Sequence, residues 1–88
     1  KYMIMEIKSS ADWWSIEQEL KTQLKSMNYN SDLYKMKDNI TVMVVELNKA
    51  EVTARRINNF KYLEPQICEI NRAINNLEKW ILTLILSQ

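Results

Sequence analysis

The sequence contains no glycine and a single proline, Pro65. The tight turns of β-hairpins depend on glycine, Asn-Gly or proline, so this composition speaks against a hairpin-rich fold. A chain without glycine also has no phosphate-cradling loop and no dinucleotide-binding fingerprint. The scarcity of turn residues therefore favours an all-α fold and argues against nucleotide sites of those two kinds.

Histidine is absent and cysteine occurs once, as Cys68. Histidine is the commonest general base and metal ligand, and a structural zinc site needs four Cys or His ligands. Glu17 and Glu19, like Glu64 and Glu69, are spaced so that they fall on different faces of a helix. We expect these carboxylates to be solvated, and we predict no enzymatic activity, no cofactor and no metal ion.

The charges are almost balanced, with 12 basic and 11 acidic residues and a net charge of +1. No part of the chain has the basic excess that marks a nucleic-acid-binding surface, so nucleic acid is a disfavoured partner. A lone cysteine rules out an internal disulfide bond and fits a reducing compartment. We therefore expect an intracellular protein, cytoplasmic by preference.

Residues 33–57 carry the most regular pattern, with apolar residues spaced alternately three and four apart. They are Leu33, Met36, Ile40, Met43, Leu47, Ala50, Ala54 and Ile57. This spacing places one apolar stripe along a helix, and a stripe of nearly four heptads needs an apolar cover, as in a coiled coil. We predict a long helix over about 32–62. The β-branched run inside it leaves one rival, in which residues 40–47 form a strand paired with residues 2–7.

A second stripe of the same spacing follows, one residue out of step with the first. It comprises Phe60, Leu63, Ile67, Ile70, Ile74, Leu77, Ile81 and Leu84. Pro65 stands at the join, where proline either starts a helix or kinks one. The pattern predicts a helix over about 65–86. A corner at Pro65 gives an antiparallel three-helix bundle, whereas a bend gives a rod that needs a partner.

The first helix is predicted over about 11–28. Ser9 and Asp12 have the spacing of a capping box just before it. Its apolar positions are Trp13, Ile16, Leu20, Leu24 and Met27. Glu17 precedes Lys21 by four residues, which predicts an exposed ion pair on one helix face.

The flanks of this helix carry weaker signals. The polar run 28–32 favours a turn, and Ser31 or Asp32 is expected to cap the next helix. Residues 1–8 are apolar on both faces of either a helix or a strand. They fit a short strand, a helical lead-in or an arm that docks on a partner.

More apolar residues are present than the two stripes use. Trp13 and Trp14 are neighbours and point about 100° apart on a helix, so one is core and the other is a cover or an anchor for a partner. The segment 80–86 is apolar around the whole helix, which is typical of burial or of lipid contact. The predicted partner-interface residues are Trp13, Trp14, Val44, Val45, Val52, Trp80, Leu82, Ile85 and Leu86.

Together these patterns predict a single all-α domain over 1–88, a three-helix bundle or helical hairpin with coiled-coil-like packing and a long central helix. A chain of this length builds a modest core, so association adds useful burial. We expect a protein–protein interaction module, acting as a scaffold, an assembly subunit or a dedicated chaperone. It would self-associate or pair with another helical protein. The alternatives are a nucleic-acid-binding regulator and a peripheral membrane protein that uses the apolar C-terminal segment.

Overall fold

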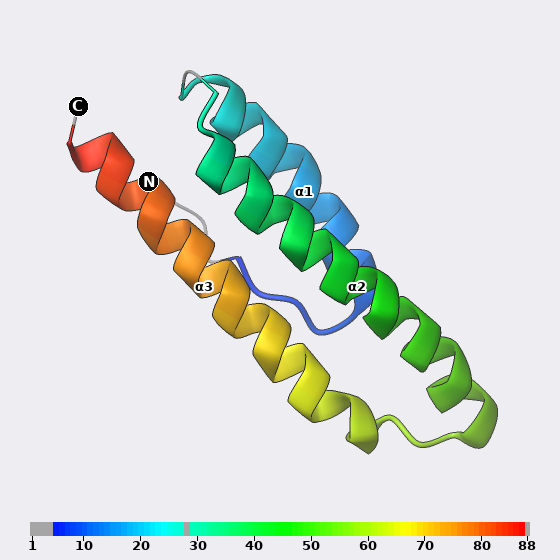
Figure 1. Cartoon of the computed structure of the whole chain (residues 1–88). Coiled ribbons are helices and arrows are strands. Elements are labelled where there is room, and N and C mark those ends of the chain that lie inside the picture. The colour runs from blue at the N-terminus through cyan, green and yellow to red at the C-terminus, as the bar shows by residue number, and fades with distance from the viewer. Residues whose placement is uncertain (1–4, 28, 88) are drawn as a thin grey trace.

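The computed structural model describes residues 5–27 and 29–87, and its regular secondary structure in those ranges is entirely helical (Figure 1). The elements are α1 (Ser10–Lys25), α2 (Ser31–Ile57), the short 3-10 helix η1 (Lys61–Leu63) and α3 (Glu64–Leu86). The predicted all-α fold of three packed helices is confirmed. The rival with a strand at 40–47 is wrong, because those residues lie inside α2.

The central element is α2, and α1 and α3 both run antiparallel to it (Figure 1). The molecule is elongated, with extents of 49 × 18 × 17 Å. Within the described ranges no Cα atom of α1 lies within 8 Å of one in α3. The two outer helices therefore have no close backbone approach to each other, and both pack against α2.

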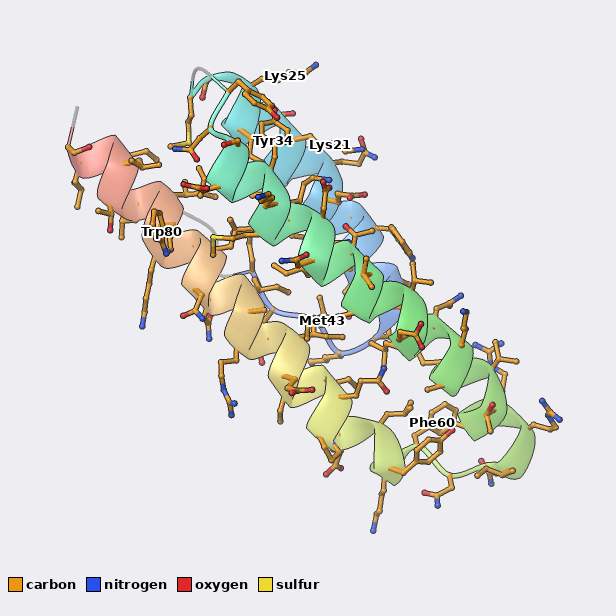
Figure 2. The ribbon with its side chains drawn as sticks, in the orientation of Figure 1. Lys21, Lys25, Tyr34, Met43, Phe60 and Trp80 are labelled. Atoms are coloured by element: carbon orange, nitrogen blue, oxygen red, sulfur yellow. The ribbon has the colours of Figure 1, made fainter. Side chains whose placement is uncertain are left out.

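Burial on α2 is wider than the predicted stripe. Its fully buried members are Leu33, Ile40, Leu47 and Ala54, and its partly buried ones are Met36, Met43 and Ala50. Lys37 and Val44 are buried as well, whereas Ile57 is exposed. Because α2 packs against two helices, residues on both sides of the predicted stripe are covered by a neighbouring helix. Figure 2 shows Met43 between α2 and α3.

The second stripe forms the buried face of α3, where Ile70, Ile74, Leu77 and Ile81 are inaccessible to solvent or nearly so. Phe60, which the spacing placed on this stripe, is instead exposed. It precedes η1 and lies in the connection between the two helices, so the helical period no longer positions it.

The chain turns a true corner between α2 and α3, which excludes the bent rod. Asn58 adopts the left-handed conformation (φ 53°, ψ 45°), and the N–H of Asn59 donates to the Ala54 carbonyl at 3.0 Å. Asparagine thus takes the position that glycine usually fills at a helix end. This ends α2 at Ile57, ahead of the predicted end near residue 62. Pro65 lies in the first turn of α3, where its missing N–H is not required.

The predicted N-terminal caps of α1 and α2 are confirmed in part. Ser9 and Asp12 form the predicted capping box. The cap of α2 is Asn30, not Ser31 or Asp32, and its side-chain oxygen accepts from the N–H groups of Asp32 and Leu33 at 3.0 and 3.2 Å.

The far end of α1 falls short of the predicted residue 28. The helix ends at Lys25, where the Ser26 hydroxyl donates to the Gln23 carbonyl at 2.8 Å. Residue 28 itself lies outside the described residues.

Residues Met5–Lys8, called the strap below, precede α1 in a non-helical segment. In Figure 1 the strap crosses from the start of α1 to the middle of α3. Met5 and Ile7 are buried in the core. Residues 1–4 of the predicted strand, lead-in or arm lie outside the described residues; the described part is an arm that docks on its own chain.

Candidate functional site

A polar cluster lies inside the interface between α1 and α2. Glu17 and Lys37 form an ion pair of 3.3 Å with side chains only 11% and 9% exposed. The Thr41 hydroxyl donates to the same Glu17 oxygen at 3.1 Å and accepts the indole N–H of Trp13 at 3.3 Å. The predictions that Glu17 is solvated and pairs with Lys21 are therefore wrong, because Glu17 faces α2.

The electrostatics of this cluster hold Lys37 in its charged form. Burial by itself lowers the pKa of Lys37, but hydrogen bonds and charge attraction from Asp38 and Glu17 outweigh it and raise the pKa above its ordinary value. A lysine held as an ammonium ion donates hydrogen bonds and does not accept protons. The cluster is thus suited to fixing how α1 and α2 align and not to acid–base chemistry.

A second polar contact joins the start of α1 to α2. Glu51 accepts the backbone N–H of Ser10 at 3.0 Å, and its other oxygen accepts the Ser10 hydroxyl. The side-chain oxygen of Asn48 lies 3.1 Å from that hydroxyl. A carboxylate at a helix N-terminus satisfies a free N–H group and favours the helix dipole. Glu51 therefore caps α1 from a neighbouring helix.

A cleft of about 340 Å³ opens beside this cap, where the start of α1 meets the corner between α2 and α3. Its lining residues are Lys8, Ser9, Ser10, Ala11, Asn48, Glu51, Arg55, Phe60, Leu63 and Ile67. Glu51 is already engaged by Ser10, and the part of the chain that the structure describes has no His/Cys/Asp/Glu group that could hold a metal ion. The cleft therefore offers neither an assembled metal site nor a free acid–base pair.

Two of the predicted interface residues belong to the protein's own core. Trp13 and Val44 are completely buried, between α1 and α2 and on the packed face of α2. Their assignment to a partner interface is wrong. Trp13 is the core member of the tryptophan pair, and Val44 is covered because α2 faces two helices. The predicted apolar stripe of residues 33–57 covers only one side of the helix. Val44 lies beside that stripe and was therefore not predicted to be core.

The other seven predicted interface residues are exposed. They are Trp14 on α1, Val45 and Val52 on α2, and Trp80, Leu82, Ile85 and Leu86 on α3. The α3 members fall within its last two turns, and Leu86 is 77% exposed. Figure 2 shows Trp80 on this end of α3. The apolar end of α3, defined as these four residues, is the densest exposed apolar group in the helices.

Sequence reasoning missed a smaller apolar group at the corner. Ile57, Phe60 and Tyr62 are each exposed, and the Tyr62 hydroxyl donates to the Ala50 carbonyl at 2.8 Å. Figure 2 shows Phe60 at the opposite end of the molecule from Trp80. The sequence signal for this group was Asn58-Asn59, where α2 ends. Beyond that point the helical spacing no longer places Ile57 and Phe60 on a buried face.

Comparison with known proteins adds no relative. No family model, curated protein sequence or solved structure matches the chain. Among the helices in the described ranges, none combines the length and apolar character needed to cross a bilayer.

Proposed function

We propose that this protein is a protein–protein interaction module, a helical scaffold, assembly subunit or dedicated chaperone that works by association with other chains. The observation that carries the proposal is the apolar end of α3. There Ile81 fills the core while Trp80, Leu82, Ile85 and Leu86 remain open to solvent. Leu82, Ile85 and Leu86 are three and four residues apart and share one side of α3, and clustered exposed apolar side chains mark association surfaces. Trp80 lies toward another side of the helix, and tryptophan is frequent among the residues that dominate binding energy.

The chemistry of the rest of the molecule supports the same proposal. The buried polar groups are engaged in holding helices together, as in the pairs Glu17–Lys37 and Ser10–Glu51. The nearly even charge balance provides no strong field for nucleic acid. Cys68 is exposed as a free thiol, which fits the intracellular location that we propose.

A second copy of the chain is the simplest partner to test. We expect size-exclusion chromatography with light scattering to give a dimer or larger assembly at tens of micromolar. Ile85→Lys with Leu86→Lys should raise the dissociation constant at least about tenfold, because each charge would be buried or would prevent burial. Asn76→Lys, an exposed change on α3 away from its apolar end, is the matched control.

Three results would count against the proposal. One is a monomer at all concentrations that binds no apolar dye. Another is an equal response to the Asn76→Lys control. The third is flotation with liposomes that depends on Ile85 and Leu86, which would assign the same apolar end to a membrane surface.

A further inference from the structure

The cleft beside the cap of α1 brings cationic and apolar side chains together. Lys8 of the strap and Arg55 in the last turn of α2 line it. Its apolar lining residues are Phe60, Leu63 and Ile67. Its volume of about 340 Å³ lies near the lower end of the range for ligand sites, roughly 300–1,000 Å³, and such sites combine an apolar lining with a few polar groups. The cleft therefore has the size and the mixed lining of a binding site.

The cations of this cleft are available to a ligand. Lys8 and Arg55 are both exposed, and neither takes part in the ion pairs found among the described residues. Glu51 is the acidic residue of the lining, and both of its oxygens already accept hydrogen bonds from Ser10. With two unpaired cations and one engaged carboxylate, the lining favours a negatively charged occupant.

The apolar surface extends beyond the cleft. Phe60 lines the cleft and is 51% exposed, and it also belongs to the exposed apolar group at the corner with Ile57 and Tyr62. A small molecule that filled the cleft would leave Ile57 and Tyr62 open to water. A chain segment covers the cleft and the neighbouring apolar residues together, so a peptide fits this surface better than a small anion does.

We propose that this cleft binds an acidic peptide segment of another protein, in which a carboxylate stands beside an apolar side chain. The planar guanidinium of Arg55 suits bidentate pairing with the carboxylate, and Lys8 adds a second positive charge. The apolar side chain of the segment packs on Phe60, whose exposed ring gains burial.

This peptide site is separate from the surface proposed for self-association. Figure 2 shows Phe60 at the opposite end of the molecule from Trp80, so an occupied cleft leaves the apolar end of α3 free. The inference goes beyond the proposed function, because it adds a second surface with a partner of defined chemistry and does not require a dimer. A chain with association surfaces at both ends is able to join two partners.

The test titrates a peptide into the ¹⁵N-labelled full chain and follows the backbone amide signals by NMR. The probe is Asp-Phe-Asp-Leu-Asp-Phe with both ends capped. We expect shifts of the Lys8, Arg55 and Phe60 amides and a Kd below about 1 mM. The capped peptides Lys-Phe-Lys-Leu-Lys-Phe and Asp-Ser-Asp-Ser-Asp-Ser lack the charge and the apolar side chains respectively. Both should bind at least about tenfold more weakly.

Two pairs of exposed variants locate the binding. Arg55→Gln should raise the Kd of the probe about tenfold, because it removes charge-assisted hydrogen bonds. Arg56→Gln makes the same charge change at the next residue, outside the lining, and should raise the Kd less than about twofold. Phe60→Ala should weaken binding, whereas Val52→Ala, exposed on α2 outside the lining, should not. Circular dichroism checks that each variant remains folded.

Three results would overturn the proposal. They are a Kd of the probe above about 1 mM, equal losses in Arg55→Gln and Arg56→Gln, and tighter binding of a single-stranded oligothymidine at the same residues, which would assign the cleft to nucleic acid. Ile85→Lys with Leu86→Lys should leave the Kd of the probe unchanged. A failure of the peptide site is thereby distinguished from a failure of the proposed self-association, which light scattering of the same variant measures.

Discussion

Glu17 and Lys37 form an ion pair across the α1–α2 interface, twenty residues apart in the chain and 3.3 Å apart in space. Both residues are buried, and Thr41 satisfies a further lone pair of the carboxylate. A buried pair of this kind contributes less to stability than to alignment, because desolvation offsets most of the charge attraction. Lys37 also pairs with the exposed Asp38 carboxylate at 3.0 Å, so Glu17 is the member that depends on the pair.

Removing one partner of this pair should destabilise the fold strongly. We expect Lys37→Met to lower the free energy of unfolding by about 3 kcal/mol, because the Glu17 carboxyl group is then left largely buried without its cationic partner. The double variant Glu17→Met with Lys37→Met should recover most of that loss. Chemical denaturation of both variants measures the coupling. Glu46→Gln, which removes the exposed 3.9 Å pair with Lys49, should change stability by less than about 0.5 kcal/mol. Equal losses in the single and double variants would contradict the interpretation.

The cap that Glu51 places on α1 gives a second prediction. Glu51→Gln keeps the shape of the side chain but weakens its hydrogen bonds to Ser10 and removes its charge from the helix N-terminus. We expect a loss of about 1 kcal/mol in the free energy of unfolding. Glu19→Gln, exposed in the middle of α1, is the control. If both variants melt at the same temperature, Glu51 is not acting as a cap.

The corner at Asn58 predicts opposite effects of glycine at two asparagines. Asn58 has φ of 53°, which glycine adopts without strain, so Asn58→Gly should leave stability unchanged or raise it by up to about 1 kcal/mol. Asn75→Gly, inside α3, should lower it by about 0.3 kcal/mol, since glycine is a poorer helix former than asparagine. Urea titrations of the two variants provide the comparison. A destabilised Asn58→Gly protein would mean that the asparagine side chain, and not its backbone conformation, ends α2.

Glu78 links stability to pH. Burial raises the pKa of Glu78 above its ordinary value of 4.5, and the hydrogen bond from the Met5 N–H offsets part of that rise. The folded protein therefore holds the proton more tightly than the unfolded chain does. Its contribution to stability is complete below pH 4.5 and is lost as the pH rises through the raised pKa.

Glu78→Gln should accordingly raise the denaturation midpoint at pH 7, because glutamine still accepts from the Met5 N–H but carries no charge to bury. The difference between variant and natural protein should shrink as the pH falls toward 4. Glu69→Gln, exposed on the same helix, should show no such convergence. A stabilising effect of Glu78→Gln that stays the same at low pH would show that the charge of Glu78 is not its cause.

Much of the backbone was predictable because its signals are local. The alternate spacing of three and four marked the buried faces of α2 and α3, and Pro65 marked the start of α3. The missed end of α2 also had a local signal in Asn58, which tolerates the left-handed conformation better than most residues. The capping box at Ser9 was readable for the same reason.

The candidate association surface was predictable only in part. Every member of the apolar end of α3 was expected to meet a partner, because the segment 80–86 is apolar around the whole helix. Trp13 and Val44 were assigned wrongly because their exposure depends on where α1 lies against α2. That position is not a property of spacing within either helix.

By itself the sequence determined that the chain is helical, where the main apolar stripes run and that no histidine-based chemistry is available. The tertiary structure alone decided which charges are buried, which of two adjacent tryptophans is core, and that Met5 and Ile7 of the strap are buried in the core with Ile7 bound to Asn71 of α3. The physical reason is range: helix formation follows side chains three and four residues apart, whereas Glu17–Lys37 and Ile7–Asn71 join residues that meet only after the helices have packed.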